Sequence, residues 1–131
     1  MMSSIYGLGS DIANENRLKS ILKKNKFFKR RIFSKSEILL CEKKKNAYSC
    51  FAKRFAAKEA LAKSIGTGFR NNLNFKDIEI LNDKIGKPYF LISRKIHNII
   101  YKRFKIKSYD IFLSISDEKD YSIAFTILQS K

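Results

Sequence analysis

The sequence has few of the residues that build disulfide scaffolds and soft-metal sites. Its 131 residues include one histidine, His97, two cysteines, Cys41 and Cys50, one proline and no tryptophan. Two cysteines are too few for a disulfide scaffold, and a single histidine gives no thiolate and imidazole cluster with the spacing of a zinc site. We therefore expect any bound metal to be held by oxygen atoms.

Long apolar runs are also missing. No run approaches the ~18 residues that a membrane helix needs. The first residues, MMSSIYGLGSD, lack the cationic start and the apolar stretch of a signal peptide. No linker-like or repeated segment interrupts the chain, and 44% hydrophobic residues are enough to fill a core. We therefore expect one domain over residues 1–131, located in the cytoplasm.

Acidic residues are scarce relative to basic ones. The chain has 12 Asp and Glu against 28 Lys and Arg, which gives a net charge of +16. Such an excess implies an anionic partner, which could be nucleic acid, an anionic membrane, a phosphorylated ligand or an acidic protein. A genome bias toward Lys, Ile and Asn is an explanation that needs no partner.

The hydrophobic patterns predict a first strand, then helices, then two pairs of strands on either side of one more helix. Ser34 followed by Glu37 predicts a capping box, and Gly66-Thr67-Gly68 ends the longest helix. This order favours an α+β fold, in which a small, mainly antiparallel sheet packs on a long central helix. The expected strands cover 4–8, 77–83, 88–93, 111–116 and 121–128, and the expected helices cover 14–25, 34–45, 47–65 and 96–104.

The helix over 47–65 contains a candidate site. Its buried stripe is expected to consist of Phe51, Phe55, Ala62 and Ile65. Glu59 lies on the border of this stripe, and Lys63 follows one turn later on a flank where Ala52 and Ala56 leave room. A carboxylate and an ammonium group one turn apart suit a catalytic site, but an ordinary i,i+4 ion pair has the same spacing.

The segment GLGSD, residues 7–11, is a second candidate. A strand that leads into two glycines and an acid suits a tight turn, which would present Asp11 at the sheet edge as a ligand for a hard cation. The dinucleotide fingerprint GxGxxG is excluded because its third glycine would fall on Ile12. A glycine turn with a surface aspartate is the alternative interpretation.

Four segments occur together in a characteristic order. They are GLGSDI from residue 7, AKRFAAKEALAKSIGTG from residue 52, DIEILND followed by GKPY from residue 77, and SISDEKDYSIAF from residue 114. In this order and at this length, the chain resembles the holo-[acyl-carrier-protein] synthase family of single-repeat 4′-phosphopantetheinyl transferases. The resemblance covers nearly the whole chain.

The resemblance implies an enzyme that transfers the 4′-phosphopantetheine arm of coenzyme A to a serine of apo-acyl carrier protein, a step in fatty acid biosynthesis. Adenosine 3′,5′-bisphosphate is released, and the reaction needs a divalent cation, usually Mg²⁺. On the matching motifs, Asp11 and Glu59 are the metal ligands, and Lys63 completes the catalytic set by contacting the phosphates. A metal held in this way would neutralise charge on the reacting phosphate oxygens.

The resemblance also implies a coenzyme A pocket lined by Arg54, Lys63, Gly66 and Thr67. The chain departs from the family at Asp117, where many members carry a histidine that contacts the phosphate-rich end of coenzyme A. Because an ionised aspartate cannot donate a proton there, no ligand-binding role is assigned to Asp117.

Two assemblies follow from the same resemblance. Acyl carrier proteins are acidic, and the family binds them with cationic residues of its first helix and the next segment. The positions that match are Arg17, Lys24, Phe28 and Arg31, although a run of charges can also be a solvated face. The family forms homotrimers with the active site at the subunit interface.

A small RNA-binding or ribosome-associated protein is the alternative. The net charge and the segment KKNKFFKRRIF, residues 23–33, could follow a phosphate backbone while its aromatic rings stack on bases. This alternative leaves Glu59 and the GLGSD segment unexplained, and the strands contain no RNP-type aromatic motif. We therefore expect neither a nucleic acid nor a membrane partner.

Overall fold

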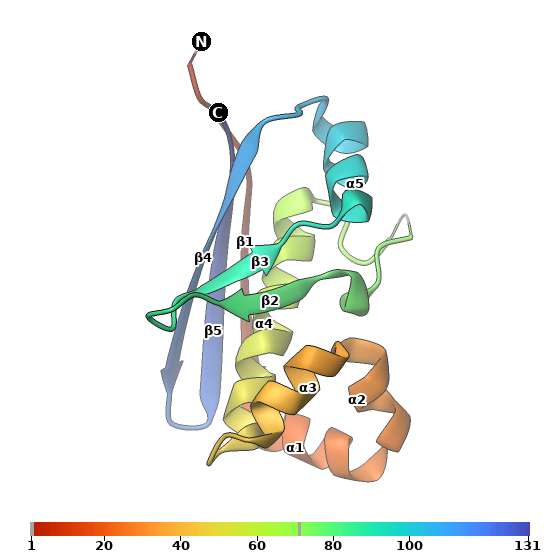
Figure 1. Ribbon diagram of the computed structural model, residues 1–131, viewed down its shortest axis with the longest axis vertical. Coiled ribbons are helices and arrows are strands. Elements are labelled where there is room, and N and C mark those ends of the chain that lie inside the picture. The colour runs from red at the N-terminus through yellow and green to blue at the C-terminus, as the bar shows by residue number, and fades with distance from the viewer. Residues whose placement is uncertain (1, 71) are drawn as a thin grey trace.

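The computed structural model describes residues 2–70 and 72–131. Figure 1 shows its strands and helices, which follow the expected α+β order. Within the described residues, no helix has both the length and the apolar character needed to cross a membrane. The elements are β1 (Ile5–Asn14), α1 (Glu15–Lys24), α2 (Lys26–Ile32), α3 (Lys35–Glu42), α4 (Ala47–Ile65), the 3₁₀ helix η1 (Phe75–Asp77), β2 (Glu79–Asn82), β3 (Pro88–Leu91), α5 (Arg94–Phe104), β4 (Tyr109–Glu118) and β5 (Tyr121–Ser130).

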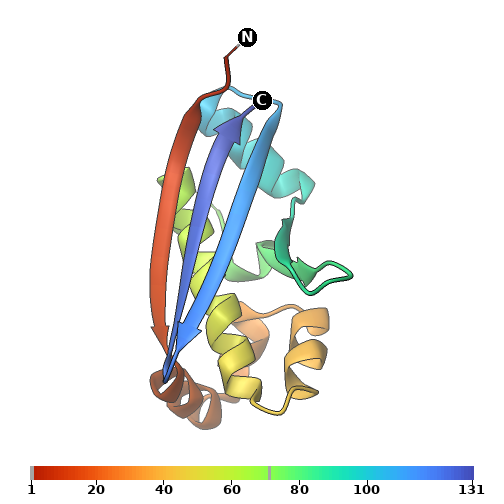
Figure 2. The ribbon, with the colours of Figure 1, turned by 90° about the vertical axis from the view of Figure 1, so that its left-hand side faces the viewer.

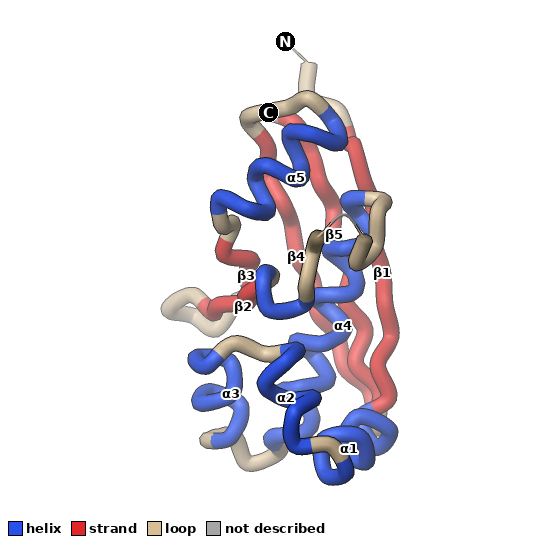
Figure 3. The backbone as a smooth tube through the Cα atoms, turned by 90° about the vertical axis from the view of Figure 1, so that its right-hand side faces the viewer, coloured by secondary structure: helices blue, strands red, loops and turns tan. Residues whose placement is uncertain are grey.

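A three-stranded antiparallel sheet packs on the long central helix, which confirms the predicted fold class. The strand order is β1-β5-β4, and β2 and β3 form a separate antiparallel hairpin. Figure 2 shows one face of the larger sheet with no helix in front of it. Figure 3 shows the opposite side, where α4 lies against the sheet and the other helices lie outside it.

β1 runs without a turn from Ile5 to Asn14, so the expectation of a turn at the glycines was wrong. The glycines are needed instead because β1 lies close to the backbone of α4. A Cβ atom on Gly9 would lie 1.8 Å from the Ala60 carbonyl oxygen, and one on Gly7 would lie 1.8 Å from the Ser64 carbonyl oxygen. Since side chains of a strand alternate between its faces, Asp11 lies on this same helix-facing side.

The expected role of the small residues of α4 was also wrong. Ala52 and Ala56 were expected to leave room beside Glu59, but both side chains are fully buried in the core. Ala57 and Ala60 are fully buried as well, so alanines cover much of the surface of α4 inside the molecule. Because these side chains are small, the strands and neighbouring helices can lie close to the backbone of α4.

Side-chain caps define the short helices. The Asn14 side chain accepts a hydrogen bond from the Arg17 amide at the start of α1, and the capping box of Ser34 and Glu37 begins α3 as predicted. The sequence did not predict α2. Asn25 ends α1, and its side chain accepts hydrogen bonds from the Phe27 and Phe28 amides, so a new helix begins directly.

A fully buried ion pair joins α3 to α4. The Lys58 Nζ lies 2.8 Å from the Glu37 Oε1, and neither side chain is exposed to solvent. The Glu37 carboxylate also accepts hydrogen bonds from the amides of Ser34 and Ile80, while Lys58 donates to the Phe75 carbonyl. Burial lowers the pKa of Lys58, and the Glu37 carboxylate opposes this shift. The pair therefore holds α3 and β2 against α4.

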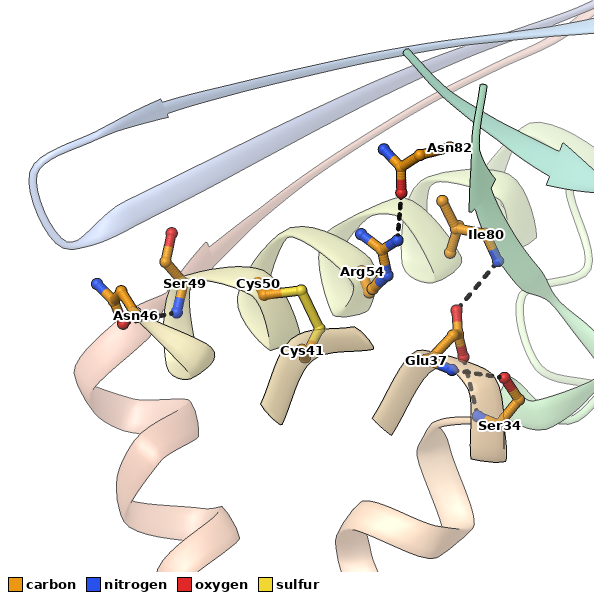
Figure 4. The surroundings of a disulfide bond; sticks show 9 residues. All are labelled: Ser34, Glu37, Cys41, Asn46, Ser49, Cys50, Arg54, Ile80 and Asn82. Atoms are coloured by element: carbon orange, nitrogen blue, oxygen red, sulfur yellow. Dashed lines mark hydrogen bonds between the residues drawn. A yellow bond between two sulfur atoms is a disulfide. The ribbon is translucent and has the colours of Figure 1, made fainter. Parts of the chain in front are cut away.

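The two cysteines form one disulfide, although they are too few for a disulfide scaffold. Cys41 lies in the last turn of α3 and Cys50 in the first turns of α4, and their Cα atoms are 5.3 Å apart. Figure 4 shows this bond at one end of α3 and the Glu37 contacts at the other.

Replacing Lys58 tests how much the fold depends on the buried pair. We expect Lys58→Met to lower the free energy of unfolding by about 3 to 5 kcal/mol, because Glu37 would then be a buried, unpaired charge. Adding Glu37→Gln should restore much of this loss. Urea denaturation followed by circular dichroism measures both, with Lys63→Met as a control at an exposed ion pair. A double variant no more stable than Lys58→Met would contradict the role of the unpaired carboxylate.

Candidate active site

The structure brings Asp11, Glu59 and Lys63 together where β1 lies on α4. The Lys63 Nζ is 3.2 Å from the Asp11 Oδ1 and donates a hydrogen bond of 3.0 Å to the Ser10 carbonyl oxygen. Glu59 precedes Lys63 by one helical turn and interacts electrostatically with both Asp11 and Lys63. We call Asp11 and Glu59 the carboxylate pair.

The carboxylate pair carries more negative charge than its surroundings neutralise. Burial raises the pKa of Asp11, and Lys63 only partly opposes this effect. Burial also raises the pKa of Glu59, and the neighbouring Asp11 raises it further, against the opposing effect of Lys63. Two partly desolvated carboxylates beside one ammonium group are therefore suited to an additional cation.

Oxygen ligands of this kind suit a hard divalent ion. Residues 2–70 and 72–131 contain no group of three or more His, Cys, Asp and Glu side chains placed to hold a metal. An ion at the carboxylate pair would therefore take most of its ligands from water or from the oxygen atoms of a substrate. Mg²⁺ commonly binds in this way, because it keeps several waters and uses one or two carboxylates.

Arg54 lies in a different place, on the wall of a groove of about 530 Å³. We call it the basic groove, because its lining includes Lys44, Lys45, Lys53 and Arg54 but only one carboxylate, that of Asp117. These four cations suit a ligand with several phosphate groups.

Arg54 is nearly buried and incompletely paired. One Nη of Arg54 donates a 2.6 Å hydrogen bond to the Asn82 side chain, as Figure 4 shows, while its buried Nε has no hydrogen-bond partner in the described part of the chain. Burial lowers the pKa of Arg54. On the same wall, the Lys53 Nζ lies 3.5 Å from the Asp117 carboxylate, so Asp117 holds a cation of the groove in place.

The basic groove and the carboxylate pair lie on different sides of α4. Arg54 and Glu59 are five residues apart, which places them about 140° apart around the helix axis. Lys63 lies about 40° from Glu59, on the side of the carboxylate pair. The structure therefore separates Arg54 from Asp11, Glu59 and Lys63 within one chain.

Gly66 and Thr67 lie at the C-terminal end of α4, beyond Lys63. Gly66 caps the helix with a φ of 91°, and Arg103 of α5 lies over it. Thr67 lines a groove of about 680 Å³ beside α5, together with Lys95 and Lys102. The four predicted coenzyme A contacts are therefore not brought together in a single chain.

The predicted docking residues lie on α1 and α2. Arg17, Lys24 and Arg31 are exposed, and Phe28 is half-buried with its ring 6.4 Å from that of Phe55. Of these four, Arg31 lines a groove of about 710 Å³ together with Arg30, Phe69 and Phe75, and we call it the aromatic groove. The sequence analysis did not include Phe69 and Phe75 among the docking residues. Their position soon after Gly68 is a signal that could have suggested them.

Comparison with known proteins identifies the family of the chain. The sequence model of the 4′-phosphopantetheinyl transferase superfamily matches residues 7–126. A holo-[acyl-carrier-protein] synthase of Pelagibacter ubique is 58% identical over 97% of this chain and 98% of its own length. A protein of the same name from Clostridium botulinum is 39% identical over 95% of this chain and 98% of its own length.

Solved structures give the same result. Holo-[acyl-carrier-protein] synthase from Neisseria meningitidis superimposes with a TM-score of 0.83 at 36% identity, covering 95% of this chain and 98% of its own. The enzyme from Bacillus anthracis, solved in complex with CoA (3′,5′-ADP), has a TM-score of 0.79 at 34% identity, with coverage of 97% and 98%. By sequence and by structure, this chain belongs to the holo-[acyl-carrier-protein] synthases of the 4′-phosphopantetheinyl transferase superfamily.

Proposed function

We propose that this chain transfers the 4′-phosphopantetheine arm of coenzyme A to a serine hydroxyl of apo-acyl carrier protein and releases adenosine 3′,5′-bisphosphate. Residues 1–131 act as one catalytic domain, and the cytoplasm is its location. The observation that carries the proposal is the convergence of Asp11, Glu59 and Lys63 at the contact between β1 and α4. Membership of the synthase family supports it.

Asp11 and Glu59 would hold the Mg²⁺ ion. Their raised pKa values, caused by burial, fit a site that is completed by a cation. When bound, the ion supplies neutralisation of the charge that develops on the phosphate oxygens during transfer. Lys63 is already held beside Asp11, so its ammonium group is oriented in advance to contact the same phosphates.

The basic groove would bind the phosphate-rich end of coenzyme A. Lys44, Lys45, Lys53 and Arg54 supply positive charge there, because all four line the groove. Asp117 would act indirectly, because it pairs with Lys53 and cannot itself donate a hydrogen bond when ionised.

A homotrimer would bring the two parts of the site together. The basic groove and the carboxylate pair lie on different sides of α4, so one coenzyme A molecule could span them if the basic groove belongs to a neighbouring subunit. The uncovered face of the larger sheet is suited to that contact, as Figure 2 shows. We call it the outer face, and its exposed apolar side chains include Leu8, Ile12, Phe112, Ile123 and Phe125.

The acidic carrier protein would bind on α1 and α2. Residues 16–36 contain nine Lys and Arg residues and no acidic residue. Arg17 and Lys24 lie on α1, and Phe28 and Arg31 lie on α2, where Arg31 lines the aromatic groove. Cations beside an apolar groove suit a negatively charged helical protein that also presents apolar side chains.

Mass spectrometry of the carrier tests the reaction. After incubation with this protein, coenzyme A and Mg²⁺, apo-acyl carrier protein should gain the mass of the phosphopantetheine arm. Asp11→Ala or Glu59→Ala should abolish the gain while circular dichroism shows an unchanged fold, because each removes one of two metal ligands. Ser10→Ala, an exposed neighbour on β1, is the matched control. RNA binding without any mass gain would favour the alternative function, and near-normal activity of either variant would contradict the metal assignment.

Charge reversal at Arg17 tests the docking surface. Arg17→Glu should lower kcat/KM for the carrier at least tenfold, equivalent to about 1.4 kcal/mol, and leave the KM for coenzyme A nearly unchanged. Added salt should also slow the wild-type reaction, because charge-steered encounter is screened within about 8 Å at physiological ionic strength. Steady-state kinetics measure these effects, with Lys107→Glu, an exposed residue between α5 and β4, as a control of equal charge change. An equal loss in both variants would contradict a specific docking site on α1.

A charge on the outer face tests the trimer. Wild-type protein should have the mass of three chains in light scattering at micromolar concentration. Ile123→Glu should give monomers that keep their circular dichroism spectrum but lose transfer activity, because Ile123 is 46% exposed and lies on the uncovered sheet face. Tyr101→Glu on the exposed side of α5 is the control. An active monomer, of either the wild type or the variant, would contradict the shared site.

A further inference from the structure

The short helix α3 is fixed at both ends by different chemistry. Near its start, Glu37 is ion-paired with Lys58 and accepts a hydrogen bond from Ile80. In its last turn, Cys41 is bonded to Cys50 of α4. Figure 4 shows the two attachments on opposite ends of the helix. Loss of one attachment would therefore leave the other in place.

The disulfide also shapes the basic groove. Cys50 itself lines the groove, and the eight residues between the two cysteines include Lys44 and Lys45, which supply two of its four cations. At the end of the segment between α3 and α4, the Asn46 side chain accepts a hydrogen bond from the Ser49 amide and caps the start of α4. The covalent bond thus turns the segment that carries Lys44 and Lys45 into a closed loop.

The two cysteines differ in exposure. Cys41 is fully buried, whereas Cys50 keeps 7% of its residue surface exposed and lies on the wall of the basic groove. Small anionic thiols such as glutathione would be attracted by Lys44, Lys45, Lys53 and Arg54, and nearby cations favour the reactive thiolate. Disulfides that occur in a reducing cytoplasm are mostly transient or redox-sensing.

We propose that the Cys41–Cys50 disulfide is a reversible redox switch that controls how tightly the basic groove binds coenzyme A. This inference rests on the proposed function of the groove. The oxidised state holds Lys44 and Lys45 in a closed loop, and the reduced state releases the C-terminal end of α3.

The switching reaction is thiol–disulfide exchange with glutathione. A glutathione thiolate attacks the Cys50 sulfur, the protein disulfide breaks, and Cys41 leaves as a thiolate that takes a proton from water. A second glutathione thiolate then attacks the mixed disulfide and releases Cys50 as a thiolate, which is also protonated. Two glutathione molecules are thereby oxidised to glutathione disulfide, and one protein disulfide is reduced to two thiols.

Reduction changes the groove more than the fold. Because Glu37 still holds the start of α3, the helix remains attached to α4 and β2. Lys44 and Lys45 gain conformational freedom, which must be lost again when a polyanion binds. We expect the Kd for coenzyme A to rise about three- to tenfold on reduction. The melting temperature should fall by about 5 to 10 °C, because the unfolded chain loses a cross-link.

The experiment compares the whole protein in its two redox states. Protein equilibrated at increasing ratios of reduced to oxidised glutathione is alkylated with iodoacetamide, and mass spectrometry counts the modified cysteines. Calorimetry then measures the Kd for coenzyme A in each state. Bound coenzyme A should slow reduction, since it would cover Cys50. The double variant Cys41→Ala/Cys50→Ala should bind like the reduced protein and no longer respond to glutathione, because it has no thiol left for exchange.

The outcomes separate the two proposals. A bond that survives a large excess of reduced glutathione, or an equal Kd in both states, would overturn the switch. A Kd that still responds to glutathione in the double cysteine variant would overturn it too, because the effect would then not come from this bond. If coenzyme A binds in neither state, the proposed function fails together with the effect on affinity, while the alkylation pattern still shows whether the bond is reducible.

Discussion

The close approach of β1 to α4 is the constraint on which the rest of the structure depends. Gly7 and Gly9 allow it, because a Cβ atom at either position would overlap a carbonyl oxygen of the helix. The contact places Asp11, two residues beyond Gly9, beside the acidic and basic side chains of the last turns of α4. Since the three functional groups lie on two rigid elements, their spacing is fixed without any loop.

The same helix then separates the two halves of the proposed site. One side of α4 carries Glu59 and Lys63 next to β1, while Arg54 lies on another side in the basic groove. The two parts face different sides of α4, and the outer face of the sheet is left apolar and uncovered. The proposed trimer is therefore a consequence of where α4 directs its side chains.

The small alanine side chains of α4 do not by themselves fix the position of the elements around it. Polar contacts and the disulfide hold those elements in place. The Lys58 and Glu37 pair joins α3 and β2 to the helix from inside the core, and the disulfide joins the other end of α3 from the groove. The buried pair is inaccessible to solvent, whereas Cys50 lines the basic groove and keeps a small part of its residue surface exposed. A reagent in solution that reduces the disulfide would therefore leave the buried ion pair of Lys58 and Glu37 in place.

The sequence by itself determined the fold class, the order of the elements, the capping box at Ser34 and the family, because these depend on local periodicity, caps and motif order. It also pointed to Asp11, although as part of a turn that the structure shows to be a strand. Only the tertiary structure decided that Arg54 lines one groove with Lys44 and Lys45, that Lys58 is a buried partner of Glu37, and that the two cysteines meet. These are contacts between residues of different elements, and they are set by how the elements pack rather than by the spacing of residues along the chain.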